Sequence, residues 1–318
     1  MSGIVITGGA GFIGSHLCDR LLEMGRQVVC LDNFDDYYDP AMKMSNLEHA
    51  RSSKGFRLIQ ADIRQADGLE SALGNLEIEA IVHLAARPGV TQSVKDPQTT
   101  FSNNVLGTQN VLDFCRKKDV QRLLFASSSS VYGSQRMGPL REDMCADRPE
   151  SPYGASKRMG EIMCFAYHRA YSFDTICMRF FTAYGPRQRP EMAVHEFVKQ
   201  ALTQHTLSAH GPPDTSRDYT YVSDVIECVT RILDRCHGYE VVNIGGGKPV
   251  MLSDLLRTIM RATGVFPEIT WKPGRVGDVP FTNADTNKLK QLIGWVPSTP
   301  IDKGVIQFVQ WFKAIHHM

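Results

Sequence analysis

Tyr153 and Lys157 are the two side chains in this sequence best suited to proton transfer. Their spacing of four residues places both on one face of a helix. A lysine ammonium close to a phenol favours the phenolate, so Lys157 is expected to lower the pKa of Tyr153, which can then accept and return a hydroxyl proton. Ser128, in the serine-rich segment 127–130, could hydrogen-bond the same substrate oxygen. An ordinary surface pair has the same spacing, so this interpretation depends on the rest of the chain.

A glycine-rich segment near the amino terminus supplies the first part of that context. Residues 8–14 read Gly-Gly-Ala-Gly-Phe-Ile-Gly, directly after an apolar strand and at the start of a helix with one apolar face. Glycine lets the backbone turn sharply and approach a pyrophosphate, and the helix amino terminus offers free N–H groups. With a strand before it and Asp32 at the end of the next strand, this segment indicates a dinucleotide site and not a plain turn.

Asp32 indicates which dinucleotide is bound. A carboxylate at the end of the second strand can accept hydrogen bonds from the adenosine ribose hydroxyls. It repels a 2′-phosphate, and no arginine follows it directly. The expected cofactor is therefore NAD and not NADP; the alternative role for Asp32 is to cap a helix or a turn.

Short apolar strands alternate with amphipathic helices through the first half of the chain. Strands are expected at residues 4–7, 28–31, 57–60, 80–83, 123–127 and 175–180. Apolar strands separated by helices indicate a parallel sheet covered on both faces, and right-handed crossovers make it doubly wound. The predicted fold class is therefore α/β, a doubly wound, Rossmann-like parallel sheet with a smaller carboxyl-terminal α/β substrate lobe.

The second half of the chain has a different texture. After residue 180 glycine and proline cluster in several loops, and helices are expected near residues 191–203, 223–235, 252–263 and 301–316. We expect residues 1–180 to form an NAD-binding domain that carries the proton-transfer residues. Residues 181–318 should form mainly the substrate-binding lobe, with some chain returning to the first domain.

The composition argues against several other classes of protein. The chain has 318 residues and a formal net charge of +1, so no nucleic-acid partner is expected. No apolar run is long enough to cross a bilayer and no leader peptide is visible, so no membrane partner is expected. The eight cysteines include no Cys-x-x-Cys pair, which indicates buried free thiols in the cytoplasm and no metal site.

Three motifs together resemble the NAD-dependent epimerase/dehydratase family of extended short-chain dehydrogenases. They are the glycine segment 8–14, the Tyr153-x-x-x-Lys157 pair and the segment 217–222, Arg-Asp-Tyr-Thr-Tyr-Val. The resemblance covers essentially the whole chain and implies a catalytic triad of Ser128, Tyr153 and Lys157. It implies an NAD site formed, besides Tyr153 and Lys157, by Gly8, Gly11, Phe12, Ile13, Gly14, Asp32, Asn33, Asp62, Ile63, Leu84, Ala85, Ala86, Asn104 and Phe180. It implies a UDP-sugar site formed by Pro88, Ser128, Ser129, Thr182, Arg189, Ser208, His210, Arg217 and Arg275.

Within this family, three segments are similar to the UDP-glucuronate 4-epimerases in particular. These segments are residues 32–39, 86–90 and 179–193. Thr182 stands where other 4-epimerases and decarboxylases tend to have asparagine, whereas Ala183 and Thr91 depart from the usual valine and arginine. Ser129 and Ser130 occupy the positions where dehydratases and decarboxylases usually carry an acidic residue, so elimination is disfavoured.

The implied reaction oxidises C4 of the sugar to a ketone, turns the sugar over and reduces the other face. Arg217 and Arg275 would grip the diphosphate, since arginine is always charged and binds phosphate through two hydrogen bonds. Arg189 and Thr182 would hold the sugar carboxylate. The alternatives are a 4-epimerase of UDP-glucose or UDP-N-acetylglucosamine, a UDP-glucuronate decarboxylase and, from another class, an NAD-binding scaffold.

The resemblance also implies a homodimer. Two amphipathic helices, near residues 99–117 and 153–171, are similar to those that form the dimer bundle in this family. Four apolar side chains of the first helix could face a partner or could simply cover the sheet: Phe101, Val105, Leu112 and Cys115.

Overall fold

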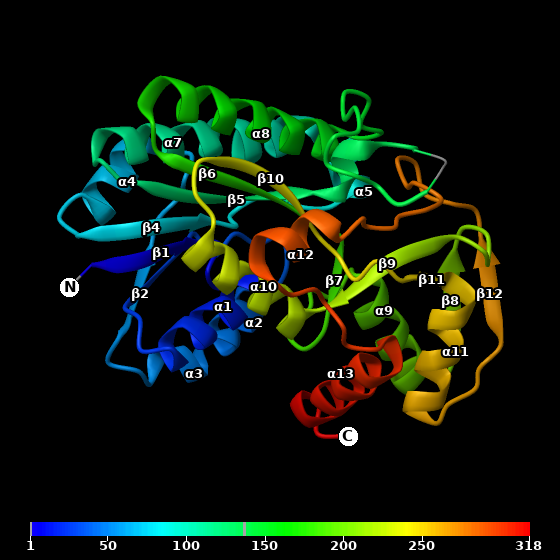
Figure 1. Cartoon of the computed structure of the whole chain (residues 1–318). Helices are drawn as coiled ribbons and strands as arrows, with labels where there is room; N and C mark the ends of the chain where they lie inside the picture. The colour runs from blue at the N-terminus through cyan, green and yellow to red at the C-terminus, as the bar shows by residue number, and fades with distance from the viewer. Residues whose placement is uncertain (1, 136–137) are drawn as a thin grey trace.

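A seven-stranded sheet forms the centre of the protein in the computed structural model, which describes residues 2–135 and 138–318 (Figure 1). The strand order is β10-β6-β5-β4-β1-β2-β3, and every pair of neighbours is parallel. The strands are β1 Gly3–Thr7, β2 Val28–Asp32, β3 Phe56–Gln60, β4 Ile78–His83, β5 Arg122–Ser128, β6 Asp174–Phe180 and β10 Tyr239–Ile244. All six expected strands are present, so the prediction of a doubly wound parallel sheet is confirmed.

The seventh strand, β10, comes from the second half of the chain and pairs with β6 at the edge of the sheet. It was not among the expected strands, because the polar residues Glu240 and Asn243 interrupt its apolar pattern. Part of the second half of the chain therefore lies in the large sheet.

Helices cover both faces of this sheet (Figure 1). On one face lie α1 Phe12–Glu23 and α10 Val222–Arg235, and on the other lie α4 Ala66–Leu73, α7 Gly107–Lys117 and α8 Pro152–Tyr171. The side chains of β1 alternate between the two cores: Ile4 and Ile6 pack in the first, and Val5 packs in the second. Shorter helical segments are α2 Pro40–Asn46, α3 Glu48–Arg51, α5 Val90–Lys95, α6 Pro97–Phe101, the π-helical turn Ser102–Leu106 and the 3-10 turn Ser129–Tyr132.

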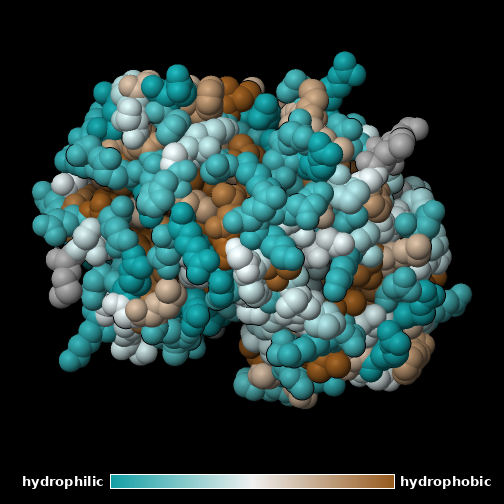
Figure 2. Space-filling view, in the orientation of Figure 1, coloured by the Kyte–Doolittle hydropathy of each residue, from teal (hydrophilic) through white to brown (hydrophobic). Residues whose placement is uncertain are grey.

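The helix expected near residues 99–117 runs through α6, the π-helical turn and α7. Leu112 and Cys115 are fully buried against the sheet, so the expectation that they face a partner is wrong for these two residues. The apolar side chains of this helix pair that remain exposed include Leu106, Ile162 and Phe165. Apolar surface is visible over the α7 and α8 pair at the upper edge of the space-filling view (Figure 2).

The second lobe contains two small sheets and three helices. One sheet has the order β11-β9-β7 and the other pairs β12 with β8. The elements are β7 Thr182–Tyr184, α9 Ala193–Lys199, the π-helical turn Gln200–Gln204, β8 Leu207–His210, β9 Ser216–Tyr221, β11 Pro249–Met251, α11 Leu252–Thr263, β12 Ile269–Lys272 and α13 Ile301–Ile315. A last short helix, α12 Asn287–Ile293, packs beside α10 and β10. The four expected helices of this half are all present, the first of them ending as a π-helical turn.

No helix in the described ranges combines the length and the apolar character needed to cross a bilayer.

Candidate active site

A cavity of 930 Å³ lies at the carboxyl ends of the parallel strands, between the sheet and the second lobe. Nearly all of the site residues predicted from the sequence line it, from the glycine segment 8–14 on β1 to Arg275 in the second lobe. The predicted cofactor, catalytic and sugar-binding residues therefore come together in one space. Two of the predicted cofactor residues, Asp62 and Asn104, do not line it.

Two positions of the glycine segment have no room for a β-carbon and so require glycine. Gly8 has a φ of 69°, and a β-carbon there would lie 2.7 Å from the backbone nitrogen of Ala85. A β-carbon on Gly14 would lie 2.3 Å from the carbonyl oxygen of Gly8. Helix α1 then begins after Gly11, which has no side chain to occupy the N–H groups of the first turn. The segment fits a dinucleotide pyrophosphate, because it combines close backbone approach with free donors.

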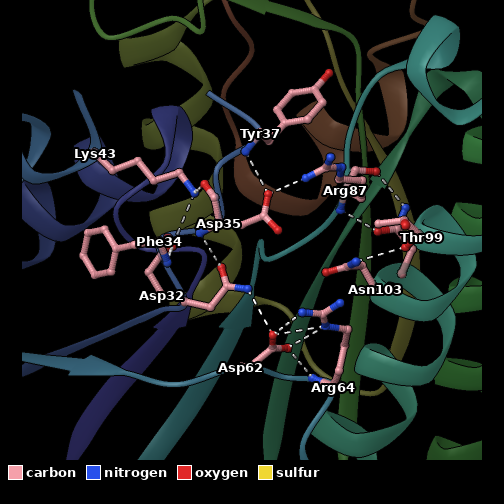
Figure 3. A network of polar contacts seen from close by, with 12 residues as sticks. Asp32, Phe34, Asp35, Tyr37, Lys43, Asp62, Arg64, Arg87, Thr99 and Asn103 are labelled. Atoms are coloured by element: carbon pink, nitrogen blue, oxygen red, sulfur yellow. Dashed lines mark hydrogen bonds and ion pairs between the residues drawn. The ribbon is translucent and has the colours of Figure 1, made fainter. Parts of the chain in front are cut away.

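Asp32 is buried at the end of β2 and is held by two backbone donors. The N–H of Ala10 donates to its Oδ2 at 3.1 Å, and the N–H of Phe34 donates to its Oδ1 at 2.9 Å. Lys43 Nζ lies 3.7 Å from Oδ1 (Figure 3). Each carboxylate oxygen has a further lone pair for a ribose hydroxyl, so Asp32 fits its predicted role.

Two loops meet over this part of the cavity through Arg87 and Asp35 (Figure 3). Arg87, in the loop after β4, forms an ion pair with Asp35, in the loop after β2. The Arg87 guanidinium also lies 4.6 Å from the centre of the Tyr37 ring. The Tyr37 N–H in turn donates to Asp35 at 2.9 Å. The sequence analysis assigned no role to Arg87, Asp35 or Tyr37. An arginine and an acidic loop that follow nearby parallel strands could have indicated this contact.

Asn104 supports the contact between Arg87 and Asp35 by hydrogen-bonding the backbone of Arg87. Its Oδ1 accepts the N–H of Arg87 at 2.7 Å and its Nδ2 donates to the carbonyl of Arg87 at 3.0 Å. The same Nδ2 lies 2.9 Å from the hydroxyl of Ser156, on the helix that carries Tyr153. Asn104 therefore positions the backbone of Arg87 and does not face the cavity.

The carboxylate of Asp62 accepts hydrogen bonds from two neighbouring side chains. Arg64 Nη2 donates to its Oδ2 at 2.6 Å, and Asn33 Nδ2 donates to the same oxygen at 3.2 Å. Burial alone would raise the pKa of Asp62, but the hydrogen bonds from Arg64 hold it below its usual range. Asp62 thus fixes Asn33, which does line the cavity.

The side chains that are predicted to be catalytic are positioned by β5 and α8. Ser128 ends β5. The hydroxyl of Ser151 accepts the N–H of Gly154 at 3.1 Å, and Pro152 occupies the first helical position, so α8 begins just before Tyr153. Lys157, one turn further along, donates to the carbonyl of Ala126 at 2.8 Å. The ring centre of Tyr153 lies 5.9 Å from the Lys157 Nζ.

The electrostatics of this pair differ from the expectation. Burial raises the pKa of Tyr153, and the hydrogen bond with Ser128 and the charge of Arg189 only partly oppose it. Burial also lowers the pKa of Lys157 from 10.5 to about 7. The predicted lowering of the Tyr153 pKa by Lys157 is therefore wrong for the protein without ligands. The physical reason is that Lys157 is directed at a backbone carbonyl and its own charged form is disfavoured by burial.

Three of the residues predicted to bind the sugar nucleotide, Arg189, Ser208 and Arg275, line the cavity from the second lobe. Arg189 Nε forms an ion pair of 2.8 Å with Glu191 Oε1, so a neighbouring loop residue balances the charge of its guanidinium. Arg275 Nη2 lies 3.6 Å from Glu196 Oε2. The buried hydroxyl of Ser208 has no hydrogen-bond partner among the described residues, so it is available to a ligand. The wall of the second lobe thus offers two arginines and a free hydroxyl.

Comparison with known proteins agrees with this geometry. Residues 4–245 match the NAD dependent epimerase/dehydratase family. A UDP-glucuronate 4-epimerase of Thermodesulfobacterium geofontis is 34% identical over 310 residues, which cover 97% of this chain and 95% of that protein. The crystal structure of UDP-glucuronic acid 4-epimerase from Bacillus cereus in complex with UDP-glucuronic acid and NAD has a TM-score of 0.91 and 33% identity, covering 98% of this chain and 99% of that one.

A UDP-glucose 4-epimerase is also similar. The structure of the Thermotoga maritima enzyme with UDP-glucose has a TM-score of 0.91 and 30% identity, and the match covers 99% of each chain. Both solved relatives thus share the whole architecture with this protein. From the match of residues 4–245 and the similarity along nearly the full length, the chain belongs to the NAD-dependent epimerase/dehydratase family.

Proposed function

We propose that this protein is an NAD-dependent 4-epimerase that interconverts UDP-glucuronate and UDP-galacturonate. The observation that carries the proposal is the position of Arg189, which lines the same cavity as Thr182 and Tyr153. Burial raises the pKa of Tyr153, and the charge of Arg189 lies close enough to oppose this rise in part. An acid-binding guanidinium beside a proton-transfer tyrosine suits a sugar that carries a carboxylate. The names of the Thermodesulfobacterium and Bacillus relatives support the same substrate.

The residues of the chain divide the work of the reaction. NAD, when bound, accepts a hydride from C4 of the sugar and returns it to the opposite face. Tyr153 takes the proton of the 4-hydroxyl and gives it back, and Ser128 hydrogen-bonds the same oxygen. Arg217 and Arg275, both in the cavity wall of the second lobe, hold the diphosphate while the sugar ring turns over.

A uronate sets an additional requirement on the site. Its 4-keto form is a β-keto acid, which loses carbon dioxide when the bond to the carboxylate lies parallel to the carbonyl π system. Arg189 and Thr182 would hold that bond near the ketone plane, where the overlap is poor. Ser130 places a hydroxyl and not a carboxylate near the triad, so a general base for elimination is not provided there.

A 4-epimerase of a neutral UDP-sugar is the second candidate, because the UDP-glucose 4-epimerase of Thermotoga maritima is similar over the whole chain. The test is incubation of the purified protein with UDP-glucuronate and with UDP-glucose, followed by chromatography of the products. Formation of UDP-galacturonate without more than traces of UDP-pentose is expected. Stoichiometric UDP-pentose would assign the protein to the decarboxylases, and conversion of UDP-glucose alone would assign it to the second candidate.

The Arg189→Ala variant tests the carboxylate directly. Loss of the guanidinium should weaken the use of UDP-glucuronate by roughly 2–5 kcal/mol if a desolvated charge pair is broken. It should also increase the share of decarboxylated product, while UDP-glucose is handled as in the wild type. If the variant uses UDP-glucuronate as well as the wild type does, the carboxylate is held elsewhere.

We also propose a homodimer built on α8. Exposed apolar side chains recur along one side of this helix at helical spacing: Met159, Ile162 and Phe165, each between 45% and 54% exposed. Leu106 adds a fourth from the neighbouring π-helical turn. Light scattering should give twice the monomer mass, and Ile162→Glu should shift the protein toward monomer.

A cytoplasmic location is part of the proposal. All eight cysteines are free thiols, and all but Cys145 are buried. Free thiols persist where the compartment is reducing. Labelling of the native protein with a thiol reagent should therefore modify Cys145 alone.

A further inference from the structure

Glu191 is an acidic residue of the cavity wall that forms an ion pair with Arg189. Arg189 Nε lies 2.8 Å from its Oε1 in an ion pair, and this nitrogen has no hydrogen-bond partner among the described residues. Tyr37 lies near enough for the charge of Glu191 to act on its phenol. All three side chains line the cavity, and the triad residue Tyr153 lines it too. The carboxylate of Glu191 therefore lies inside the space that a ligand would use.

The side chains of Arg189 and Tyr37 are held in place independently of Glu191. The Arg189 guanidinium lies 5.7 Å from the centre of the Tyr37 ring, on which Arg87 also stacks at 4.6 Å. The backbone of Tyr37 is fixed by its N–H bond to Asp35. Burial raises the pKa of Tyr37, and the charge of Glu191 raises it further, so the phenol stays protonated and donates. An arginine whose Nε has no hydrogen-bond partner among the described residues, with a protonated phenol nearby, can form a binding site for a carboxylate.

Glu191 is the less confined member of the ion pair. Its side chain is 41% exposed, against 18% for Arg189. The carboxylate can turn outward into solvent while the guanidinium and the phenol stay in the cavity wall. A partly exposed ion pair contributes little to stability, so its exchange for another carboxylate costs little.

We propose that Glu191 is an internal stand-in for the carboxylate of the substrate. The acidic sugar displaces Glu191, and Tyr37 joins Arg189 in binding the sugar carboxylate. A neutral sugar offers no such exchange and leaves the Arg189–Glu191 pair in place. Glu191 and Tyr37 thereby set the selectivity for acidic UDP-sugars; this inference rests on the proposed function and deepens it.

A second glutamate in the same cavity provides a matched control. Glu196 lies 3.6 Å from Arg275, and its side chain is 32% exposed. Glu196→Gln removes the same charge from the same cavity, but beside an arginine assigned to the diphosphate, which acidic and neutral UDP-sugars share. Any effect of Glu196→Gln should therefore be equal for the two kinds of sugar.

The experiment is titration calorimetry of the NAD-loaded protein with UDP-glucuronate and with UDP-glucose. Glu191→Gln keeps the shape of the side chain and removes its charge. It should tighten UDP-glucuronate binding by a factor of about two to five, the range that loss of a partly exposed competing ion pair supports. The affinity for UDP-glucose should not change by more than it does in Glu196→Gln.

Tyr37→Phe gives a second, non-additive readout. In the wild type the phenol exchanges one carboxylate for another, so Tyr37→Phe alone should change the affinity for UDP-glucuronate little. In the Glu191→Gln background the Tyr37 phenol has no carboxylate of the protein to exchange for that of the sugar. Tyr37→Phe should therefore weaken the binding of UDP-glucuronate several times more than it does in the wild type. NAD content and thermal unfolding of each variant show whether the site is intact.

The outcomes separate this inference from the proposed function. If Glu191→Gln shifts both sugars equally, as Glu196→Gln does, Glu191 is only a cavity charge and the inference is wrong, whatever the wild type catalyses. If UDP-glucuronate binding tightens selectively but the wild type makes no UDP-galacturonate, the proposed function is wrong and the carboxylate site stands. If the effects of Tyr37→Phe and Glu191→Gln on the affinity for UDP-glucuronate are additive, Tyr37 does not bind the sugar carboxylate.

Discussion

Arg87 reaches from the loop after β4 to the carboxylate of Asp35 in the loop after β2, and it stacks on Tyr37 as it does so (Figure 3). The two loops follow strands on either side of β1, whose own end carries the glycine segment. The contact therefore bridges the dinucleotide side of the cavity. Such a bridge would help to retain the cofactor, which a 4-epimerase regenerates within each turnover.

Arg87→Gln should accelerate the loss of NAD from the purified protein. Loss of one partly buried ion pair and one cation–π contact amounts to roughly 1–2 kcal/mol, or about fivefold to thirtyfold in the dissociation rate. The rate is measured by dialysis against NAD-free buffer and chromatography of the retained cofactor. Arg141→Gln, which breaks an exposed ion pair with Asp143 away from the cavity, is the control. Equal retention in wild type and Arg87→Gln would contradict a bridging role.

Tyr153→Phe removes the hydroxyl of the proposed proton acceptor and keeps the ring. Turnover of UDP-glucuronate should fall on the order of 10²–10⁴-fold, while NAD stays bound. The comparison is single-turnover kinetics of the two proteins at equal NAD content. Near-normal turnover in Tyr153→Phe would show that another group moves the proton.

Asp32→Ser should relax the preference for NAD over NADP. The carboxylate repels a 2′-phosphate, and Lys43, 3.7 Å from Asp32, would remain to attract one. The ratio of the two affinities should shift by about tenfold or more, because juxtaposed like charges cost several kcal/mol. Competition binding with cofactor-stripped protein measures the ratio. If the wild type already binds NADP as well as NAD, Asp32 does not act on the ribose hydroxyls.

His83, at the end of β4, makes the stability of the fold sensitive to acid. Its Nδ1 accepts the hydroxyl of Thr7 at 2.7 Å, and its Nε2 donates at 3.0 Å to Thr108, whose own hydroxyl donates to the carbonyl of Asn104. This arrangement requires a neutral ring. Burial, together with the nearby charge of Lys157, lowers the pKa of His83 from 6.5 to about 3.

The unfolded chain therefore binds one more proton than the folded chain between pH 6.5 and pH 3. Stability is unaffected by His83 above this window and falls as the pH drops through it, by up to about 1.4 kcal/mol for each pH unit. Urea unfolding at a series of pH values should show a flatter acid slope for His83→Gln than for wild type, whatever the offset in stability. The exposed His49→Gln should keep the wild-type slope, and an unchanged slope in His83→Gln would contradict this account.

The sequence was informative where one residue type is required by local chemistry. Gly8 and Gly14 have no room for a β-carbon, and an apolar strand with a helix on each side has few alternatives to a parallel sheet. These features can be predicted from a single chain, and so can the placement of Tyr153 and Lys157 one turn apart on the same helix.

Properties that depend on packing could not be predicted in the same way. The pKa of Tyr153 depends on burial and on where Lys157 points, which no spacing reveals. Asn104 carries the expected residue type, yet its amide is taken by the backbone of Arg87. The pairing of Arg87 with Asp35 joins residues 52 positions apart, through the order of strands in the sheet.

The return of β10 to the edge of the large sheet means that the two halves of the chain are not separable modules. A fragment ending after β6 would leave the backbone donors and acceptors of that strand open along one side, an invitation to aggregate. It would also lose α10, which packs beside α1 on one face of the sheet. The segment after residue 180 therefore cannot be exchanged as one block, in evolution or in protein engineering, because it also supplies β10 and α10 to the large sheet.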